Sequence, residues 1–334
     1  MSESRLTFAL RTGAIHLPAA GRIAVFRPRA GLDLSAIPRD RIEIVQGNRP
    51  DHDAWVRLGY RVGVSPSGEF SGAIVELPRS RAEARALIAQ ATIHGGQVIV
   101  DGQKTDGIDS LLRELRARAD VSEPCAKAHG KAFQFQAAPE TFADWALPDT
   151  LTLESGWTTA PGMFSADGPD PASVALARTL PPKMPGRVAD LGAGWGYLAF
   201  HVLERRGVTE CALVEAEHAA LEAARQNIRD DRARFYWADA IDWTDSEPFD
   251  NVVMNPPFHN GRAADPSLGA AFIAQAARIL GPHGTLWMVA NRHLPYEAPL
   301  GQAFAEVHEL AGTPGFKIYT ANRPRRQRTV TRRR

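Results

Sequence analysis

Apolar residues along the chain fall into two kinds of short segment, and the two kinds alternate. Segments rich in Val and Ile that are bounded by Gly, Pro or charged residues are typical of strands. Segments whose apolar residues recur three or four positions apart predict helices with one buried face. In the first half, this pattern predicts strands at 22–28, 41–47, 72–78 and 97–102, and helices at 80–94 and 106–119.

The second half repeats the alternation more clearly. Its pattern predicts strands at 187–194, 210–216, 233–239, 249–255, 284–291 and 316–323, and helices at 197–206, 218–228 and 265–281. Residues 120–186, between the two series, are interpreted as a connector with a strand-like stretch at 131–139 and a helix beginning near Pro171. Because alternating strands and helices indicate parallel sheets, we predict two α/β domains in tandem, at 1–150 and 151–334.

Length and composition agree with this organisation. The chain has 334 residues, which is more than one core usually supports, and its 44% apolar and 23% charged residues are ordinary for a globular protein. Cys125 and Cys211 cannot build a disulfide framework and lack a zinc-type spacing, which favours a reducing compartment. No segment is long and apolar enough to span a bilayer, and residues 1–13 lack the pattern of a signal peptide. We therefore expect a cytoplasmic protein without a membrane partner.

The net charge of +1 hides an asymmetry at the end of the chain. The twelve residues 323–334 contain seven arginines and no acid, and without them the totals of 39 basic and 38 acidic residues become 32 and 38. A mildly acidic body with a basic tail is consistent with a nucleic-acid partner. A solvated tail without a partner gives the same pattern, so the charge leaves both interpretations open.

A glycine-rich turn follows the first strand of the second half. The segment DLGAGWG, residues 190–196, has Gly192, Gly194 and Gly196 at alternate positions. Glycine tolerates positive φ and has no Cβ, so a ligand can lie directly on the backbone at the start of the next helix. Open α/β sheets bind ligands at this edge, beyond the carboxyl ends of the strands.

The acidic residues near this turn help to distinguish which ligand it binds. GWGYLA at 194–199 also satisfies a dinucleotide-binding pattern, so a nicotinamide-dependent oxidoreductase is an alternative. Asp190, however, is unsuited to a neighbouring pyrophosphate and suits a ligand with a cationic amino group, such as S-adenosyl-L-methionine. Glu215 and Asp239 end the next two predicted strands, where they are expected to accept hydrogen bonds from ribose hydroxyls and from the adenine amine.

The fourth predicted strand of the second half ends in Asn255-Pro256-Pro257-Phe258. An exocyclic base amine is a poor nucleophile because its lone pair is delocalised into the ring. Two acceptors can orient such an amine, and Asn255 offers a side-chain oxygen while Pro256 offers a rigid carbonyl with no competing N–H. Phe258 offers a face for a base that has left its stack. The motif predicts N-methylation of a base amine; the alternative is a strand end with Phe258 in the core.

The pairing of DLGAGWG with NPPF resembles the class I S-adenosylmethionine-dependent methyltransferases that modify base amines. Residues 161–173 and 289–300 are further similar to the ribosomal RNA small subunit methyltransferase C family and to a related family that modifies RNA of the large ribosomal subunit. The resemblance implies two tandem Rossmann-like methyltransferase domains, of which only the C-terminal one binds cofactor. It implies that the second domain is a doubly wound, mostly parallel sheet with a final antiparallel strand. It also implies methylation of guanine N2, with 16S ribosomal RNA or the small ribosomal subunit as partner.

Family roles carry over to the residues already named and to two more. The cofactor-binding residues implied are Asp190, Gly192, Gly194, Gly196, Glu215 and Asp239, with Phe164 and Asp170 as further contacts, and the catalytic residues are Asn255, Pro256, Pro257 and Phe258. Two positions depart from the family pattern. Glu215 stands where Asp is usual, and Ala172 stands where Gly is usual.

Several functions remain open at this point. The same pocket chemistry serves adenine N6 or a protein glutamine amide, and a non-catalytic RNA-binding protein can keep the same scaffold. The ten histidines show no metal-ligand spacing, so no metal is expected. The sequence does not indicate an oligomeric state.

Overall fold

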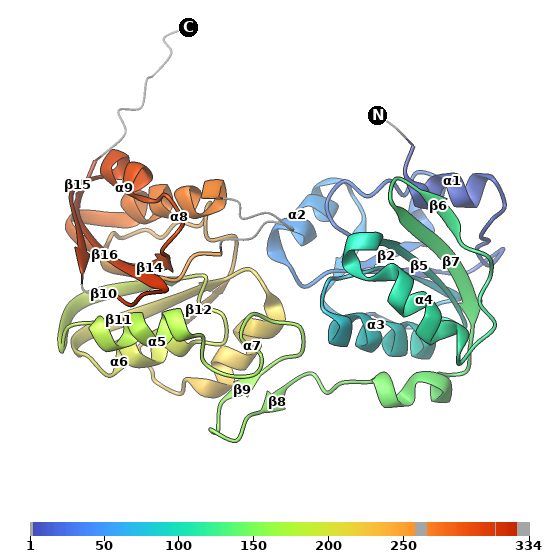
Figure 1. Ribbon diagram of the computed structural model, residues 1–334, viewed down its shortest axis with the longest axis horizontal. Coiled ribbons are helices and arrows are strands. Elements are labelled where there is room, and N and C mark those ends of the chain that lie inside the picture. The colour runs from blue at the N-terminus through green and yellow to red at the C-terminus, as the bar shows by residue number, and fades with distance from the viewer. Residues whose placement is uncertain (1–2, 258–265, 311, 326–334) are drawn as a thin grey trace, which may run out of the picture. The chain divides into compact units, whose positions relative to one another are not determined.

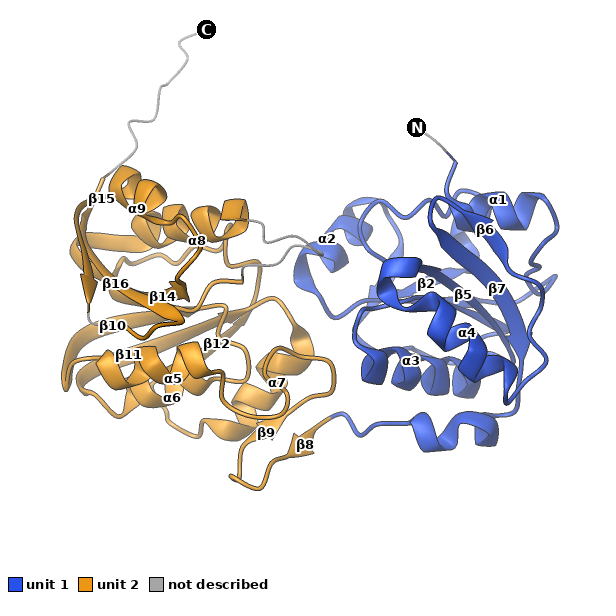
Figure 2. Ribbon diagram, in the orientation of Figure 1, with its two compact units in different colours: residues 1–149 blue, residues 150–334 orange. Residues whose placement is uncertain are grey.

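The computed structural model describes residues 3–257, 266–310 and 312–325. The chain divides into two compact units, unit 1 from Met1 to Asp149 and unit 2 from Thr150 to Arg334 (Figure 2). This division lies one residue from the boundary expected from the sequence. Each unit contains one seven-stranded sheet.

The sheet of unit 1 has the strand order β3-β2-β1-β4-β5-β7-β6. Its strands are β1 (Ile23–Phe26), β2 (Ile42–Val45), β3 (Arg61–Gly63), β4 (Gly72–Glu76), β5 (Gln97–Gln103), β6 (Cys125–Lys127) and β7 (Gly130–Gln136). Its helices are α1 (Arg5–Arg11), α2 (Arg49–Arg57), α3 (Arg81–His94) and α4 (Ile108–Arg116), with 3₁₀ turns η1 (Arg39–Arg41), η2 (Lys104–Asp106) and η3 (Pro139–Trp145). Strands β1 to β5 pair in parallel, and β7 is antiparallel to both of its neighbours.

Unit 2 has a sheet of order β12-β11-β10-β13-β14-β16-β15, and a two-stranded hairpin of β8 (Leu151–Thr152) and β9 (Thr158–Thr159) precedes it. The strands are β10 (Lys183–Leu191), β11 (Arg206–Glu215), β12 (Ala233–Trp237), β13 (Phe249–Met254), β14 (Leu280–Asn291), β15 (Phe304–Leu310) and β16 (Phe316–Pro324). The helices are α5 (Pro171–Thr179), α6 (Tyr197–Leu203), α7 (His218–Asn227), α8 (Pro266–Ile279) and α9 (Glu297–Ala303). Strands β10 to β14 pair in parallel, and β16 is antiparallel to both of its neighbours.

Helices cover both faces of the unit 2 sheet (Figure 1). Helices α5, α6 and α7 pack on one face and share a buried cluster with Val188 and Leu213 of the strands. On the opposite face, α8 and α9 share a second cluster with Ala189 and Leu191. Successive strand residues point to opposite faces, so the buried runs of these strands serve both clusters.

The two sheets have the same topology, because numbering each from its own first strand gives the order 3-2-1-4-5-7-6 in both. This confirms the predicted fold class of two tandem, doubly wound, mostly parallel sheets. The order reverses between β1 and β4 in unit 1, and between β10 and β13 in unit 2. A crevice for ligands is expected at such a switch point.

The interpretation of residues 120–186 as a connector is wrong in its first part, because β6 and β7 complete the sheet of unit 1. Several peripheral elements were not predicted: α1, α2, β3, α9 and β15. These elements bury few side chains; Trp55 is the buried residue of α2, and β3 buries none of its three. Both α2 and β3 are short and contain few apolar residues, so the apolar runs that indicate a buried element are missing there.

Replacing Gly196 by Ala tests how tightly the glycine turn packs. Gly196 has a φ of +91°, and a Cβ there would lie 2.8 Å from Cδ1 of Ile228. We expect unit 2 to lose about 1–2 kcal/mol through the backbone conformation and about 1–3 kcal/mol more through the clash. The control is Gly107→Ala at the start of α4, where φ is +87° but no heavy atom lies within 4 Å. Denaturant-dependent hydrogen exchange in each unit measures both losses, and equal losses would contradict the packing account.

Candidate active site

Strand register brings three predicted residues to one row at the edge of the unit 2 sheet. Leu191 of β10 pairs with Val214 of β11 on one side and with Met254 of β13 on the other. The next residues along these strands are Gly192, Glu215 and Asn255. The N–H groups of Gly192 and Ala193 both donate to the Val214 carbonyl, at 2.9 and 3.2 Å, so the turn begins directly from the sheet.

A hollow of about 50 Å³ lies at this edge. It is lined by Phe164, Ser165, Asp170, Ser173, Gly192, Ala193, Gly194, Trp195, Tyr197, Leu198 and Asn255. The glycine turn, the asparagine of the NPPF motif and the loop before α5 therefore meet in one place. Among the lining side chains, Phe164 is 60% exposed, which leaves its ring free to contact a ligand.

The glycine turn presents its backbone to this hollow. Gly192 and Gly194 have φ values of +73° and +56°, in the left-handed region that favours glycine. A Cβ at Gly194 would meet no heavy atom within 4 Å, so the space beside its backbone is open. Gly196 does not line the hollow but caps α6.

Two side chains hold the turn in place from behind. The indole Nε1 of Trp195 donates to the Ser165 carbonyl at 3.1 Å and so ties the turn to the loop before α5. Asn227, at the end of α7, donates to the carbonyls of Trp195 and Thr158 at 2.8 Å each and accepts from the Thr158 N–H at 2.7 Å. The turn is therefore attached to both α7 and the β8–β9 hairpin.

Asn255 is held through its side-chain nitrogen. Its Nδ2 donates to Oδ2 of Asp170 and to Oγ of Ser173, both at 2.9 Å. Asp170 is the N-cap of α5, and its Oδ2 also accepts from the Ser173 N–H at 2.9 Å. Because both amide hydrogens are donated to these acceptors, the Asn255 side chain offers its oxygen to a donor in the hollow.

Glu215 ends β11 and Asp239 lies two residues beyond the end of β12, and neither residue lines the hollow. The two carboxylate oxygens of Glu215 accept from the N–H groups of Gly194 and Glu217, at 2.8 and 2.7 Å, and burial raises the pKa of this carboxyl. Asp239 accepts from the Ile241 N–H at 3.1 Å. Their contacts with ribose and adenine remain predictions.

Asp190 is fully buried in β10, two residues before Gly192. Neither carboxylate oxygen makes a hydrogen bond within the described part of the chain, although the Ala199 N–H lies nearby. Burial raises the pKa of Asp190 to about 8, and the neighbouring Glu215 carboxyl adds to the rise. A buried carboxyl without a partner is unusual and often marks a binding site.

The remaining motif residues differ in how much the structure says of them. Pro256 is buried and Pro257 is exposed, whereas Phe258 lies outside the described residues. Sequence reasoning did not identify Ser165, Ser173, Tyr197 or Leu198 in the hollow. The start of α5 had a detectable signal, because an Asp followed by Pro is typical of a capped helix, but that signal does not mark Ser173.

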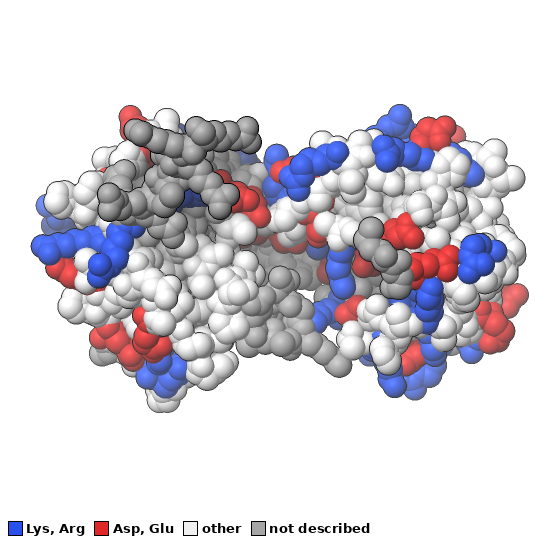
Figure 3. Space-filling view, turned by 90° about the horizontal axis from the view of Figure 1, so that it is seen from above, with Lys and Arg blue, Asp and Glu red and all other residues white. Residues whose placement is uncertain are grey.

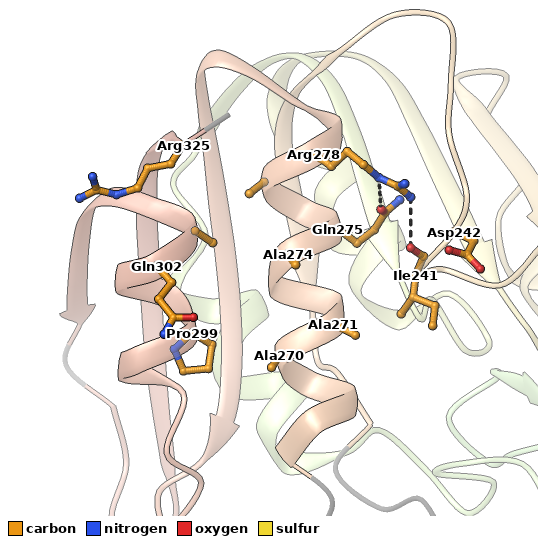
Figure 4. Close-up of a pocket in the computed structure, with 12 residues that line it drawn as sticks. Ile241, Asp242, Ala270, Ala271, Ala274, Gln275, Arg278, Pro299, Gln302 and Arg325 are labelled. Atoms are coloured by element: carbon orange, nitrogen blue, oxygen red, sulfur yellow. Dashed lines mark hydrogen bonds between the residues drawn. The ribbon is translucent and has the colours of Figure 1, made fainter. Parts of the chain in front are cut away.

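A larger cavity of about 800 Å³ lies between α8 and α9 (Figure 4). It is lined largely by alanines of α8, with Pro299 and Gln302 of α9 opposite. Arg278 points away from α9 and donates to Gln275 and to the Ile241 carbonyl, at 2.7 and 3.1 Å. None of the predicted site residues that the structure describes contributes to this cavity.

Within the described ranges, no three His, Cys, Asp or Glu side chains gather in a way that could hold a metal ion. In that same part of the chain, no helix has the length and apolar character needed to cross a membrane.

Comparison with known proteins identifies the class of protein. Residues 154–320 match the family model of the methyltransferase small domain. The solved structure of the T. thermophilus 16S rRNA N2 G1207 methyltransferase (RsmC) in complex with AdoMet and guanosine superimposes on this chain with a TM-score of 0.75. That match covers 96% of this chain and 92% of the other, and 23% of the residues are identical.

Curated relatives narrow the class to one family. Ribosomal RNA small subunit methyltransferase C of Psychromonas ingrahamii is 32% identical over 263 residues, which are 75% of each chain. The protein of the same name from Shewanella amazonensis is 28% identical over 271 residues, covering 77% of this chain and 78% of the relative. The chain belongs to the ribosomal RNA small subunit methyltransferase C family, which confirms the resemblance seen in the sequence. It is an enzyme of the methyltransferase class, and the nicotinamide-dependent alternative is set aside.

Asp190→Asn tests the buried carboxyl through stability. The unfolded carboxyl loses its proton near pH 4 and the folded one near pH 8, so the folded state binds more protons between these values. The free energy of unfolding of unit 2 is therefore expected to fall as pH rises from 4 to 8. Asparagine does not ionise, so the variant does not lose stability in this way. At pH 8, its free energy of unfolding should therefore be higher than that of the wild type by up to about 5 kcal/mol.

Denaturant titrations of the protein without added ligand, from pH 4.5 to 8.5, measure this difference. The same change at the exposed Asp231 is the control. Parallel pH profiles for the wild type and Asp190→Asn would mean that the Asp190 carboxyl is not held in its neutral form.

Proposed function

We propose that the protein uses S-adenosyl-L-methionine to methylate the N2 amine of a guanine in 16S ribosomal RNA. The main support is that the glycine turn and the Asn255 side chain, whose nitrogen is held by Asp170 and Ser173, line the same hollow at the switch point of the unit 2 sheet. The family assignment supports ribosomal RNA of the small subunit as the substrate. The T. thermophilus protein of similar fold, titled as an N2 methyltransferase in complex with guanosine, supports the choice of guanine.

The residues present fit this cofactor. Asp190 has a buried carboxyl with no hydrogen-bond partner in the described chain, and it suits the cationic amino group of the ligand. The open backbone at Gly192 and Gly194 would hold the ligand's chain, while Glu215 and Asp239 would accept from its ribose and adenine. When bound, S-adenosyl-L-methionine supplies a methyl group activated by a sulfonium.

The hollow must enlarge when a ligand binds. A volume of about 50 Å³ is far below the several hundred Å³ of a typical ligand pocket. The wall that can move is the loop carrying Phe164 and Ser165, because Phe164 is largely exposed and Ser165 has a strained φ of +55°. We expect this loop to shift outward and Phe164 to cover the bound cofactor.

The NPPF motif would hold the base. Asn255 Oδ1 and the Pro256 carbonyl accept the two N–H bonds of the amine, which turns its lone pair toward the methyl group. The prolines fix the backbone that carries this carbonyl. Phe258 remains the predicted stacking surface. The rate enhancement then comes from alignment and electrostatic fit, and no strong general base is needed.

Unit 1 would serve as a cofactor-free copy that grips RNA or stabilises unit 2. Phe26 of β1 pairs with Val45 and Val75, as Leu191 pairs with its neighbours in unit 2. The next residues in this row are Arg27, Gln46 and Glu76 instead of glycine, glutamate and asparagine. Arg27 donates to Gln46 at 3.3 Å, and the Arg29 N–H donates to Glu76 at 2.7 Å, so side chains occupy the edge that a cofactor would need.

Methyl transfer from tritiated cofactor tests the proposal. We expect label in N2-methylguanosine after incubation with 16S RNA or small subunits that lack the modification. A wild-type protein that is inert on naked RNA, subunits and intact ribosomes would favour a non-catalytic RNA-binding role. Label in N6-methyladenosine, or on a glutamine amide, would redirect the substrate assignment. We further propose that the enzyme acts in the cytoplasm, where these substrates are made.

Asn255→Ala tests the role of the amide. Loss of one electrostatic partner of a reacting group typically costs about 100- to 1000-fold in rate, and we expect a fall in kcat of this size. Affinity for S-adenosylhomocysteine, measured by calorimetry, should barely change. Asn322→Ala is the control, because Asn322 pairs with Thr285 toward the opposite edge of the sheet. A large loss of cofactor affinity in Asn255→Ala would contradict the assigned role.

The basic tail is a candidate RNA contact. On the described surface that Figure 3 shows, basic and acidic side chains are interspersed over unit 1 rather than gathered by sign. The tail after Arg325 has five further arginines: 326, 328, 332, 333 and 334. Changing these five to Gln should weaken RNA binding and reduce its salt dependence by up to about 0.7 in slope per lost single-strand phosphate contact.

Binding titrations between low and moderate salt measure this slope. Arg323 and Arg325 are kept, because Arg323 pairs with Glu306 at 2.9 Å and the Arg325 N–H donates to Ala303 at 2.8 Å. Val330→Ser, which leaves the charge intact, is the control. An unchanged slope in the Gln variant would indicate a solvated tail without a role in binding.

A further inference from the structure

The side-chain amide of Asn255 has two faces of opposite character, and only one of them suits the proposed substrate. Its oxygen accepts hydrogen bonds, whereas its nitrogen donates two. A turn of half a revolution about the last side-chain bond exchanges the two groups with little change in shape. An N–H directed at the base amine would repel it, so the reaction requires one orientation. Something in the protein has to fix that orientation.

Asp170 supplies a group that can only accept. An ionised carboxylate has no hydrogen to donate, so the amide nitrogen is the only part of Asn255 that can bond to it. The Nδ2–Oδ2 distance is 2.9 Å, and Asp170 lies 85 residues before Asn255. Ser173 Oγ accepts from the same nitrogen at 2.9 Å. Turning the amide over would bring its oxygen against a carboxylate oxygen, which is unfavourable.

Asp170 is itself fixed by the helix that it caps. Its Oδ2 accepts from the Ser173 N–H, and Pro171 occupies the first turn of α5. Helix α5 is anchored through Leu176 and Ala177, which are 0% and 3% exposed in the cluster beneath the sheet. The orientation of the amide is therefore set by a rigid helix end and not by the loop that carries Phe164.

We propose that Asp170 and Ser173 are positioning residues that hold the Asn255 amide with its oxygen toward the base amine. This inference rests on the proposed function, and it assigns Asp170 to the catalytic asparagine in place of the cofactor contact expected from the sequence. The two residues act through Asn255 and touch neither the methyl group nor the base.

Asp170→Asn is the sharpest variant. Asparagine keeps the shape and still caps a helix about as well as aspartate. Its neutral oxygen accepts from the Asn255 nitrogen less strongly than a carboxylate does, and its amide can present an N–H there by giving up the cap bond to the Ser173 N–H, so the preference for one orientation of Asn255 is weaker. We expect kcat to fall about 10- to 100-fold, the range that corresponds to a lost hydrogen bond with a charged partner, while KM for S-adenosylmethionine stays near the wild-type value. Ser173→Ala should cost about 2- to 10-fold in kcat.

A matched control separates positioning from helix capping. Ser80 caps α3 of unit 1 and accepts from the Glu83 N–H at 3.3 Å. It does not belong to the unit that contains the hollow. Ser80→Ala removes a cap of the same kind and should leave kcat unchanged. If Asp170→Asn instead raises KM for the cofactor and weakens binding of S-adenosylhomocysteine, as expected of a loosened cofactor site, Asp170 is a cofactor contact and the proposal fails.

Exchanging the carboxylate of Asp170 with the amide of Asn255 is expected to restore part of the activity. Asn255→Asp alone would bring two carboxylates to hydrogen-bond distance and should be nearly inactive. The double variant Asp170→Asn/Asn255→Asp restores one carboxylate and one amide to the pair, and it leaves an oxygen for the base amine. We expect it to be more active than Asn255→Asp alone. Effects that simply multiply would contradict a direct coupling between the two side chains.

Hydrogen exchange of the Asn255 side-chain amide, measured without cofactor or substrate, tests the hydrogen bonds from Asn255 to Asp170 and Ser173 directly. The side-chain NH₂ signals of Asn255 in the ¹H–¹⁵N spectrum are assigned by their loss in Asn255→Ala. We expect these hydrogens to exchange with solvent more slowly in the wild type than in Asp170→Asn or Ser173→Ala. Equal rates would overturn the proposal even if methyl transfer is observed. Slow exchange in a wild-type protein that transfers no methyl group would support the positioning of Asn255 by Asp170 and Ser173, but it would contradict the proposed function.

Discussion

The register of three parallel strands is the constraint on which the site in unit 2 depends. β10 lies between β11 and β13, and Leu191 pairs with Val214 on one side and with Met254 on the other. The residues that follow these three, Gly192, Glu215 and Asn255, therefore form one row. A slip of one residue would turn the side chains of a strand to the opposite face. The buried residues of β10 and β13, including Ala189 and Val252 at 0% exposure, oppose such a slip. The packing of the core therefore also aligns the glycine turn with the asparagine.

Unit 1 shows that strand order alone does not make this site. Its sheet has the same topology, and the corresponding row contains Arg27, Gln46 and Glu76. Bulky, hydrogen-bonded side chains there replace the open backbone found at Gly194. The fold supplies an edge with exposed strand ends, and the residues at that edge decide whether a ligand can lie against it.

The sequence predicted most of the unit 2 sheet because its strands are buried on both faces and read as short apolar runs. It did not predict α2 or β3, which are short and bury one side chain between them. In the site, the turn and the asparagine were visible as local motifs. Ser173 and Asn227 were missed because their partners lie 82 and 69 residues away, and no pattern within one segment can reveal such a contact. The burial of Asp190 was also beyond sequence reasoning: an acid before a glycine turn suggested a cationic ligand, but only the structure shows a fully buried carboxyl without a hydrogen bond in the described chain.

Methylation of guanine N2 in 16S ribosomal RNA is the activity proposed for this edge of unit 2. Mass spectrometry of nucleosides from 16S RNA, isolated from cells with and without the chain, tests it most directly. We expect the amount of N2-methylguanosine to decrease when the chain is absent, and to return with the wild-type gene but not with an Asn255→Ala gene. An unchanged level of N2-methylguanosine in cells that lack the chain would contradict it.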